Sequence, residues 1–151
     1  MKMNSLAFAC LGMLAVAPFV LPASAQNLDV IKERQTAMKT MGKAAKASGQ
    51  MLKGDKPFDA ATAAAVFTDM QASAAKFGGL FPEDSKTGGD TEAAPAIWQK
   101  PEEFKAKLTK FQGDIAAAIA AKPADLDSFK ASFQTVSANC KSCHQEFRVD
   151  K

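Results

Sequence analysis

Apolar residues recur along this chain at steps of three and four residues, the spacing of one face of an α-helix. The most regular case lies between residues 126 and 147, where seven apolar or thiol side chains share one face. They are Leu126, Phe129, Phe133, Val136, Cys140, Cys143 and Phe147. The pattern predicts a helix over residues 126–147.

Three earlier segments show the same period and are separated by glycine and proline. A helix is expected over residues 28–48, ending at Gly49, and its apolar positions are Ile31, Met38, Met41 and Ala45. Asp59 is the expected cap of a helix that runs to residue 77, with a buried face of Ala63, Val66, Met70, Ala74 and Phe77. A third helix starts at Pro101 and stops before Pro123, and its stripe is Phe104, Leu108, Phe111, Ile115 and Ile119.

Four amphipathic helices of about 20 residues with short connections predict one all-α domain, an antiparallel four-helix bundle whose core can hold a ligand. Residues 80–100 form the exception, a long connection. Phe81, Ile97 and Trp98 at its two ends are expected to pack over one end of the bundle, with residues 86–92 more exposed and no direct chemical role.

Composition supports the all-α prediction, because the chain has 30 alanines, 6 valines, 4 isoleucines and no tyrosine. The formal net charge is +3, from 19 basic and 16 acidic residues interspersed along the sequence. Neither a basic stripe nor stacking aromatic residues are evident, so nucleic-acid binding is not expected.

The first 25 residues have the pattern of an export signal, with Lys2 followed by an apolar run over residues 6–21 and Ala-Ser-Ala at residues 23–25. We expect cleavage after Ala25 and a single domain over residues 26–151. The alternative, a membrane anchor, would need roughly 20 apolar residues, and this run is shorter and contains Pro18. Cys10 lies in the signal segment, so Cys140 and Cys143 are the cysteines of the mature protein.

The run Cys-Lys-Ser-Cys-His at residues 140–144 matches the attachment sequence for a c-type haem. On a helix, Cys140 and Cys143 lie one turn apart, so both sulfurs can bond to one porphyrin, and His144 can ligate its iron. A Cys140–Cys143 disulfide, a thioredoxin-like redox pair and a zinc site are the alternatives. The redox pair lacks a βαβ pattern, zinc would have three clear ligands, and a disulfide leaves His144 unexplained.

The chain resembles the class II cytochromes c, the cytochrome c prime family, in three places. The run Cys-Lys-x-Cys-His-x-x-Phe-Arg at residues 140–148, on the last helix of an exported chain, resembles the family's haem motif. Arg-Gln-Thr-Ala-Met-Lys at residues 34–39 resembles its first-helix motif. Phe81-Pro82, then Pro-Ala-Ile-Trp at residues 95–98 and Phe104, resembles the loop before its third helix.

The resemblance implies a left-handed four-helix bundle with one covalent haem c, His144 as the proximal iron ligand and residue 38 on the opposite face. In low-spin relatives a methionine there ligates the iron, whereas in the cytochromes c prime an apolar residue blocks this position. We expect Met38 to be the distal ligand, with Met41 and Met70 as rivals. The resemblance also supports a contact of Arg34 with a haem propionate; the alternative is a surface salt bridge with Glu33 or Asp29. Arg148 is expected to cap the last helix, or else to tune the proximal face.

The predicted function is that of a periplasmic electron carrier that is not an enzyme and exchanges electrons with redox partner proteins. The alternative is a five-coordinate protein that binds or sequesters nitric oxide or carbon monoxide. We expect no membrane insertion after signal cleavage, and a monomer or a homodimer.

Overall fold

The computed structural model describes residues 26–149. The predicted signal peptide, residues 1–25, lies outside the described residues, as do the last two residues of the chain. No helix within residues 26–149 is long and apolar enough to cross a membrane.

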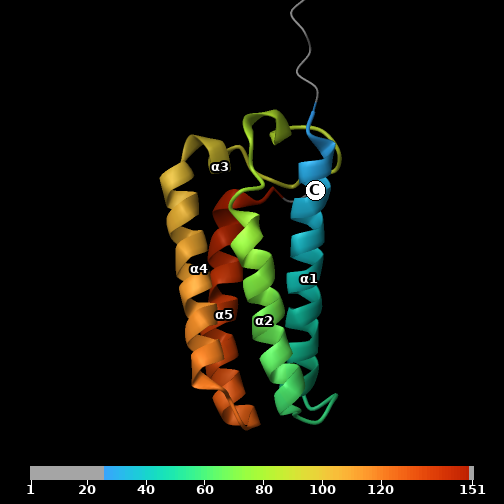
Figure 1. Cartoon of the computed structure of the whole chain (residues 1–151), viewed down its shortest axis with the longest axis vertical. Coiled ribbons are helices and arrows are strands. Elements are labelled where there is room, and N and C mark those ends of the chain that lie inside the picture. The colour runs from blue at the N-terminus through green and yellow to red at the C-terminus, as the bar shows by residue number, and fades with distance from the viewer. Residues whose placement is uncertain (1–25, 150–151) are drawn as a thin grey trace, which may run out of the picture.

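Four long helices form an antiparallel bundle (Figure 1), as the periodicity predicted. Each helix packs against two neighbours, in the order α1, α2, α4, α5 and back to α1. The short helix α3 and a 3-10 turn, η1, lie in the connection between α2 and α4. The bounds are α1 Leu28–Leu52, α2 Ala60–Phe77, η1 Glu83–Ser85, α3 Ala96–Gln99, α4 Pro101–Ala121 and α5 Leu126–Phe147.

Side-chain caps set the starts of α2 and α5, as expected for α2. The carboxylate of Asp59 accepts a hydrogen bond from the backbone N–H of Thr62 at 2.7 Å. At the start of α5, Asp125 accepts from the N–H of Ser128 at 2.8 Å, and the Ser128 hydroxyl accepts in return from the N–H of Asp125 at 3.3 Å. This reciprocal capping satisfies backbone donors that a helix end leaves unpaired.

The predicted end of α1 at Gly49 is wrong, because the helix continues to Leu52. Gly49 costs helix stability on the order of 1 kcal/mol, but the next turn buries Met51, which is 2% exposed. Burial of one apolar side chain contributes more than one glycine costs. The helix ends before Gly54, which has the left-handed φ of 78° that glycine adopts without strain.

The core is divided into two clusters. The larger one fills the bundle around Phe67, Met70 and Phe129. The smaller one, Phe77, Ile97, Phe104 and Phe147, lies under the α2–α4 connection. Met38 packs against both clusters, so it marks the boundary between them.

The α2–α4 connection crosses one end of the bundle (Figure 1), as predicted. Trp98 donates its indole N–H to the carbonyl of Phe81 at 2.9 Å. The Phe81 ring in turn meets Phe77 and Phe104 edge to face, with centroids 5.0 and 4.9 Å apart. The connection is therefore an ordered cap held by aromatic packing.

Candidate functional site

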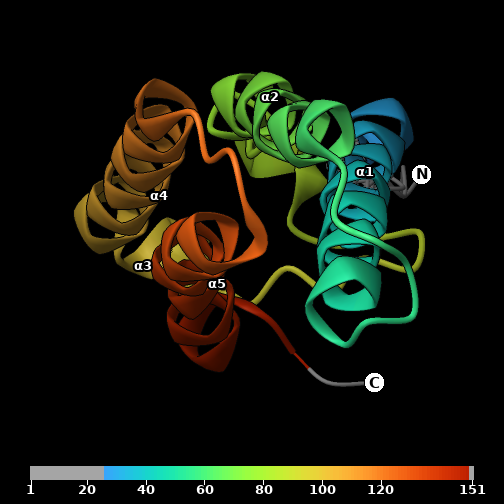
Figure 2. The same cartoon turned by 90° about the horizontal axis from the view of Figure 1, so that it is seen from below.

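A cavity of about 580 Å³ lies between the two core clusters and has walls from all four long helices. The contact between α1 and α5 is the least extensive of the four, and Figure 2 shows these two helices splayed apart. Apolar side chains form most of the wall, among them Phe77, Phe104 and Phe111. The bundle thus provides a large apolar space between α1 and α5.

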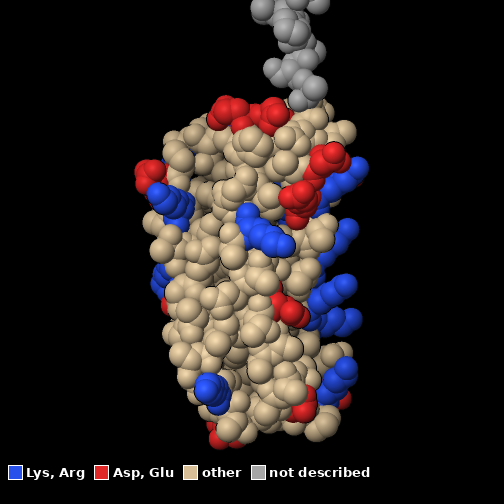
Figure 3. All heavy atoms as spheres, in the orientation of Figure 1, with Lys and Arg blue, Asp and Glu red and all other residues tan. Residues whose placement is uncertain are grey.

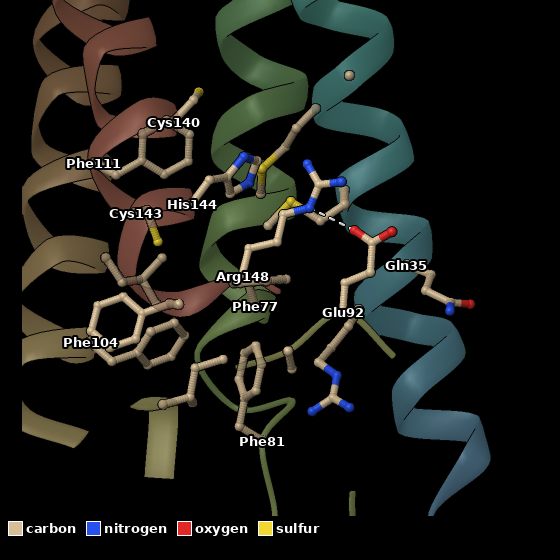
Figure 4. A pocket seen from close by; sticks show the side chains of 18 of the residues that line it. Gln35, Phe77, Phe81, Glu92, Phe104, Phe111, Cys140, Cys143, His144 and Arg148 are labelled. Carbon is tan, nitrogen blue, oxygen red and sulfur yellow. Dashed lines mark hydrogen bonds and ion pairs between the residues drawn. The ribbon is translucent and has the colours of Figure 1, made fainter. Parts of the chain in front are cut away.

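Cys140, Cys143 and His144 all line this cavity from α5. Their helix is unbroken from Leu126 to Phe147, so the two sulfurs lie one turn apart on one face, as the motif requires. Figure 4 shows the three side chains together, with the His144 imidazole directed into the pocket. The structure therefore brings the predicted attachment residues and the predicted proximal ligand to one wall.

None of the three alternatives for this motif is formed in the structure. Cys140 and Cys143 are half-buried free thiols. Burial is the main cause that raises the pKa of both thiols, which disfavours the thiolate form that a redox pair or a zinc site needs. Over residues 26–149, no group of three His, Cys, Asp or Glu side chains is arranged to hold a metal ion.

The cavity wall also includes the three methionines named as candidate ligands. Met38 and Met41 come from α1, and Met70 comes from α2. Met41 and Met70 are buried in the larger core cluster, whereas Met38 is half-buried. Among the three, Met38 is therefore the methionine that can turn its side chain into the cavity with the smallest loss of core packing.

Arg34 is buried on α1 and bound by the α2–α4 connection. Its guanidinium donates to the Ser85 carbonyl at 2.7 Å, the Ser85 hydroxyl at 3.1 Å, the Leu80 carbonyl at 3.2 Å and the Thr91 hydroxyl at 3.3 Å. The alternative prediction of a surface salt bridge with Glu33 or Asp29 is therefore wrong. The forked guanidinium fits a site with several acceptors at fixed angles.

The hydrogen-bond acceptors of the Arg34 guanidinium are all uncharged. Its four acceptors are carbonyls and hydroxyls, and Arg34 belongs to none of the ion pairs within residues 26–149. The guanidinium carbon lies 4.7 Å from the centroid of the Phe81 ring. Burial lowers the pKa of Arg34, yet an arginine remains protonated in proteins. Because Arg34 also lines the cavity, its positive charge acts on that space.

Arg148 is the C-cap residue of α5, and its backbone N–H donates to the His144 carbonyl at 3.3 Å. It also lines the cavity, and the stabilisation of the helix end by its charge stays a prediction. No sequence pattern predicted its partner Glu92, whose carboxylate lies 2.7 Å from the Arg148 guanidinium (Figure 4). Two backbone hydrogen bonds run beside this ion pair, from Val149 N–H to Glu92 O at 2.9 Å and from Ala94 N–H to Phe147 O at 3.0 Å. We call residues 92–94 the strap, because they tie the connection to the end of α5.

Sequence reasoning also missed two polar contacts between α4 and the part of α5 that carries the haem motif. Lys107 donates to the carbonyl of Ser142 at 3.2 Å. One turn earlier on α5, the amide of Asn139 donates to Asp114 at 2.7 Å. Lys107 stands between Phe104 and Phe111 at helical spacing, at the edge of the apolar stripe. That spacing is the signal that could have identified it as facing the site.

These residues fit a haem c. The cavity has apolar walls for the porphyrin ring, and one helix carries two thiols and an imidazole. Methionine side chains stand on other walls, and the buried Arg34 is a cation for the propionate edge of the haem.

Comparisons with known proteins agree with this fit. Residues 29–148 match the family model described as Cytochrome C'. Cytochrome c' of Rhodopseudomonas palustris is 43% identical over 126 residues, which cover 82% of this chain and 84% of the relative. Cytochrome c-556 of Agrobacterium tumefaciens (strain II Chrys) is 37% identical over 80% of this chain and 98% of the relative.

Solved structures show the same likeness. A structure of cytochrome c' from Rhodopseudomonas palustris has a TM-score of 0.78 at 41% identity and covers 82% of this chain and 98% of its own. A nitric oxide complex of a mutant cytochrome c prime from Alcaligenes xylosoxidans has a TM-score of 0.69 at 35% identity and covers 83% of this chain and 98% of its own. The chain therefore belongs to the cytochrome c' family, with one covalently attached haem c per chain.

Proposed function

We propose that the protein is a periplasmic electron carrier and not an enzyme. Cys140 and Cys143 attach the haem, His144 ligates its iron from α5, and Met38 ligates it from α1. One observation carries the proposal: Met38 and His144 line the same cavity from the two helices that diverge around it. Histidine–methionine ligation suits electron transfer, because a soft thioether favours reduced iron and raises the reduction potential.

The haem, when bound, supplies an iron that changes between the ferric and ferrous states. The chain holds this group in a fixed place and excludes water from it. Phe77, Phe104 and Phe111 provide apolar walls, and the surrounding helices fix them. Rigid ligands and a dry pocket limit structural change when the charge of the site changes, which favours rapid electron exchange.

Arg34 is proposed to contact a haem propionate. A buried cation whose acceptors are all neutral lacks a counter-charge, and a carboxylate at the cavity would supply one. The test is the resonance Raman band of propionate bending in the holoprotein. We expect it to shift in Arg34→Lys, while Glu33→Gln, at an exposed neighbouring position that does not line the cavity, leaves it in place. An unshifted band in Arg34→Lys would contradict the contact.

The ligand set is tested by the visible absorption spectrum of the ferric and ferrous holoprotein. We expect sharp low-spin bands and a weak methionine–iron charge-transfer band in the ferric form. Met38→Ala should abolish that band and yield a high-spin spectrum. Met41→Ala is the matched control, because Met41 also lines the cavity from α1. If Met41→Ala changes the spin state and Met38→Ala does not, Met41 is the ligand.

The second candidate function is the binding or sequestration of nitric oxide or carbon monoxide. It is favoured by one observation: the similar cytochrome c prime from Alcaligenes xylosoxidans has been solved as a nitric oxide complex. In this alternative Met38 crowds the distal face without ligating iron. Addition of carbon monoxide to the ferrous protein separates the two, since a ligated iron responds slowly or not at all, whereas an open one changes its spectrum at once.

Export to the periplasm rests on residues 1–25. We expect the mature protein isolated from its host to begin at Gln26 and to appear in the periplasmic fraction, which intact mass spectrometry of that fraction would establish. A protein that retains Lys2 would contradict cleavage.

The proposed partners are redox proteins, and sedimentation of the holoprotein would decide between a monomer and a homodimer.

A further inference from the structure

Four lysines form one line along α1. Lys32, Lys39, Lys43 and Lys46 are separated by seven, four and three residues, so they fall on one face of the helix, and all four are exposed. Figure 3 shows basic side chains in a column along the edge that α1 occupies in Figure 1. We call these residues the lysine stripe. The linear sequence interleaves them with other residues, which is why the expectation of no basic stripe is wrong for this helix.

The charge of the stripe is largely uncompensated. Lys32 lies 3.8 Å from Asp29, and both side chains are highly exposed. Lys39, Lys43 and Lys46 belong to none of the ion pairs formed within residues 26–149. A nearly neutral chain, of net charge +3, thus places four positive charges along about 21 Å of one helix.

The stripe borders the mouth of the cavity. Lys39 and Gly42 are exposed, yet both line the cavity, so the cavity reaches the surface beside them. Lys43 and Lys46 continue from that point along the same face. A molecule that docks on the stripe is therefore held next to the opening of the site between α1 and α5.

We propose that the lysine stripe is the docking surface for an acidic protein that exchanges electrons with this one. The inference rests on the proposed carrier function, because an electron partner must approach the opening of the haem site. A membrane surface is a poorer fit, since the large apolar side chains exposed within residues 26–149 are Leu28, Leu126 and Val149, and on α1 Leu28 alone, one turn before Lys32, stands on the face of the stripe. Electron-transfer encounters are small and short-lived, and steering by complementary charge increases their rate.

The first test measures the rate at which one electron passes from the reduced holoprotein to hexacyanoferrate(III), an anion that mimics an acidic partner. The variant is Lys43→Glu with Lys46→Glu, since neither residue lines the cavity. The control, Lys105→Glu with Lys130→Glu, makes the same change in net charge on α4 and α5. At low ionic strength we expect the stripe variant to react about tenfold more slowly and the control to change by less than about twofold.

The cation tris(1,10-phenanthroline)cobalt(III) provides the opposite arm. It accepts one electron as well, and the stripe variant should reduce it faster than the wild type. At about 0.5 M salt the rates of all variants should converge, because screening shortens the range of these charges to a few ångströms. Equal effects of the stripe and control variants would overturn the proposal.

A second readout is independent of the haem reaction. Lysine acetylation of the holoprotein is measured with and without poly-L-glutamate, and Lys39, Lys43 and Lys46 should be protected while Lys105 and Lys130 remain reactive. Stripe lysines that are already protected without the probe, in a protein that sediments as a dimer, would assign this face to self-association. Protection by phosphatidylglycerol vesicles but not by poly-L-glutamate would assign it to a membrane. Either result overturns the proposal.

The outcomes separate this inference from the function on which it rests. A holoprotein that reduces neither reagent at high ionic strength is not an electron carrier, whatever the footprint shows. A holoprotein that reduces both reagents, with stripe and control variants alike, remains a carrier but does not dock through the lysine stripe.

Discussion

The guanidinium of Arg34 donates to both the hydroxyl and the carbonyl of Ser85, a residue 51 positions away in the sequence. This pair joins the second turn of α1 to the connection that caps the bundle. Arg34 also lines the cavity. One side chain therefore links the fold of the cap to the charge of the candidate haem site.

Replacement of Arg34 by lysine should reduce the free energy of unfolding by about 2–4 kcal/mol, because an ammonium cannot satisfy four acceptors spaced for a fork. Denaturant unfolding of the holoprotein measures the change. Gln35→Ala is the control, since it removes one exposed hydrogen bond to the Asp90 carbonyl and should cost less than about 0.5 kcal/mol. Equal costs for the two variants would show that the fork does not hold the cap.

The ion pair between Glu92 and Arg148 should contribute little to stability, because 45% and 41% of the two side chains are exposed. A double-mutant cycle with Glu92→Gln and Arg148→Gln should give a coupling energy of about 0.5 kcal/mol that disappears in 1 M salt. The backbone bond from Ala94 to Phe147 should keep the strap closed, so the Ala94 amide stays protected from hydrogen exchange in both variants. A coupling above about 2 kcal/mol would make the ion pair the main clasp.

Alanine variants of Met70 and Met38 should separate a role in core packing from a role in iron ligation. Met70 is 1% exposed, so Met70→Ala should lower the free energy of unfolding by about 2–4 kcal/mol through the lost contacts and the cavity left behind. Its ferric spectrum should keep the methionine charge-transfer band. Met38→Ala should have the smaller effect on stability and lose the band. Guanidinium unfolding and the spectrum of the same samples provide both readouts.

Asp114 should make the protein sensitive to acid. The Lys110 ammonium, which donates to Asp114 at 2.6 Å, and the Asn139 amide lower the pKa of this carboxyl. A lowered pKa in the folded state means that the stabilisation is complete above the unfolded value, about 3.9, and is lost as pH falls through the folded value. Asp114→Asn should therefore cost on the order of 1 kcal/mol at pH 7 and almost nothing at the acid end. A cost that stays constant from pH 7 to about pH 2 would contradict this assignment.

The bundle and the motif could be predicted because both are local. The spacing of Val66, Met70 and Phe77 fixes which face of α2 is buried, and the same helical geometry places Cys140 beside Cys143. The partners of Arg34 and Arg148 could not be predicted in this way. Ser85 and Glu92 lie in a connection without periodicity, and tertiary packing alone decides where its carbonyls and carboxylates meet the helices.

The end of α1 shows a conflict between local and tertiary preferences. Gly49 indicates a break, yet the burial of Met51 carries the helix one turn further. The opposite error concerns the lysine stripe, where the linear charge pattern looks mixed. The four lysines share one face only once the segment is folded as a helix, so composition and charge counts do not reveal this basic surface.

Three helical glycines should respond differently to alanine. Gly49 and Gly113 have open space where a Cβ would stand, and neither lines the cavity. Alanine at each should raise the free energy of unfolding by about 0.5–1 kcal/mol, because glycine loses more backbone entropy on folding.

Gly42 also has open space at its Cβ position within the chain, but it forms part of the cavity wall. Under the proposed function its neighbour there is the haem, so Gly42→Ala should fail to stabilise the holoprotein and should shift its absorption bands, whereas the other two leave the spectrum unchanged. Thermal unfolding and visible spectra of the three variants test this, and equal stabilisation by all three with identical spectra would place the haem away from α1.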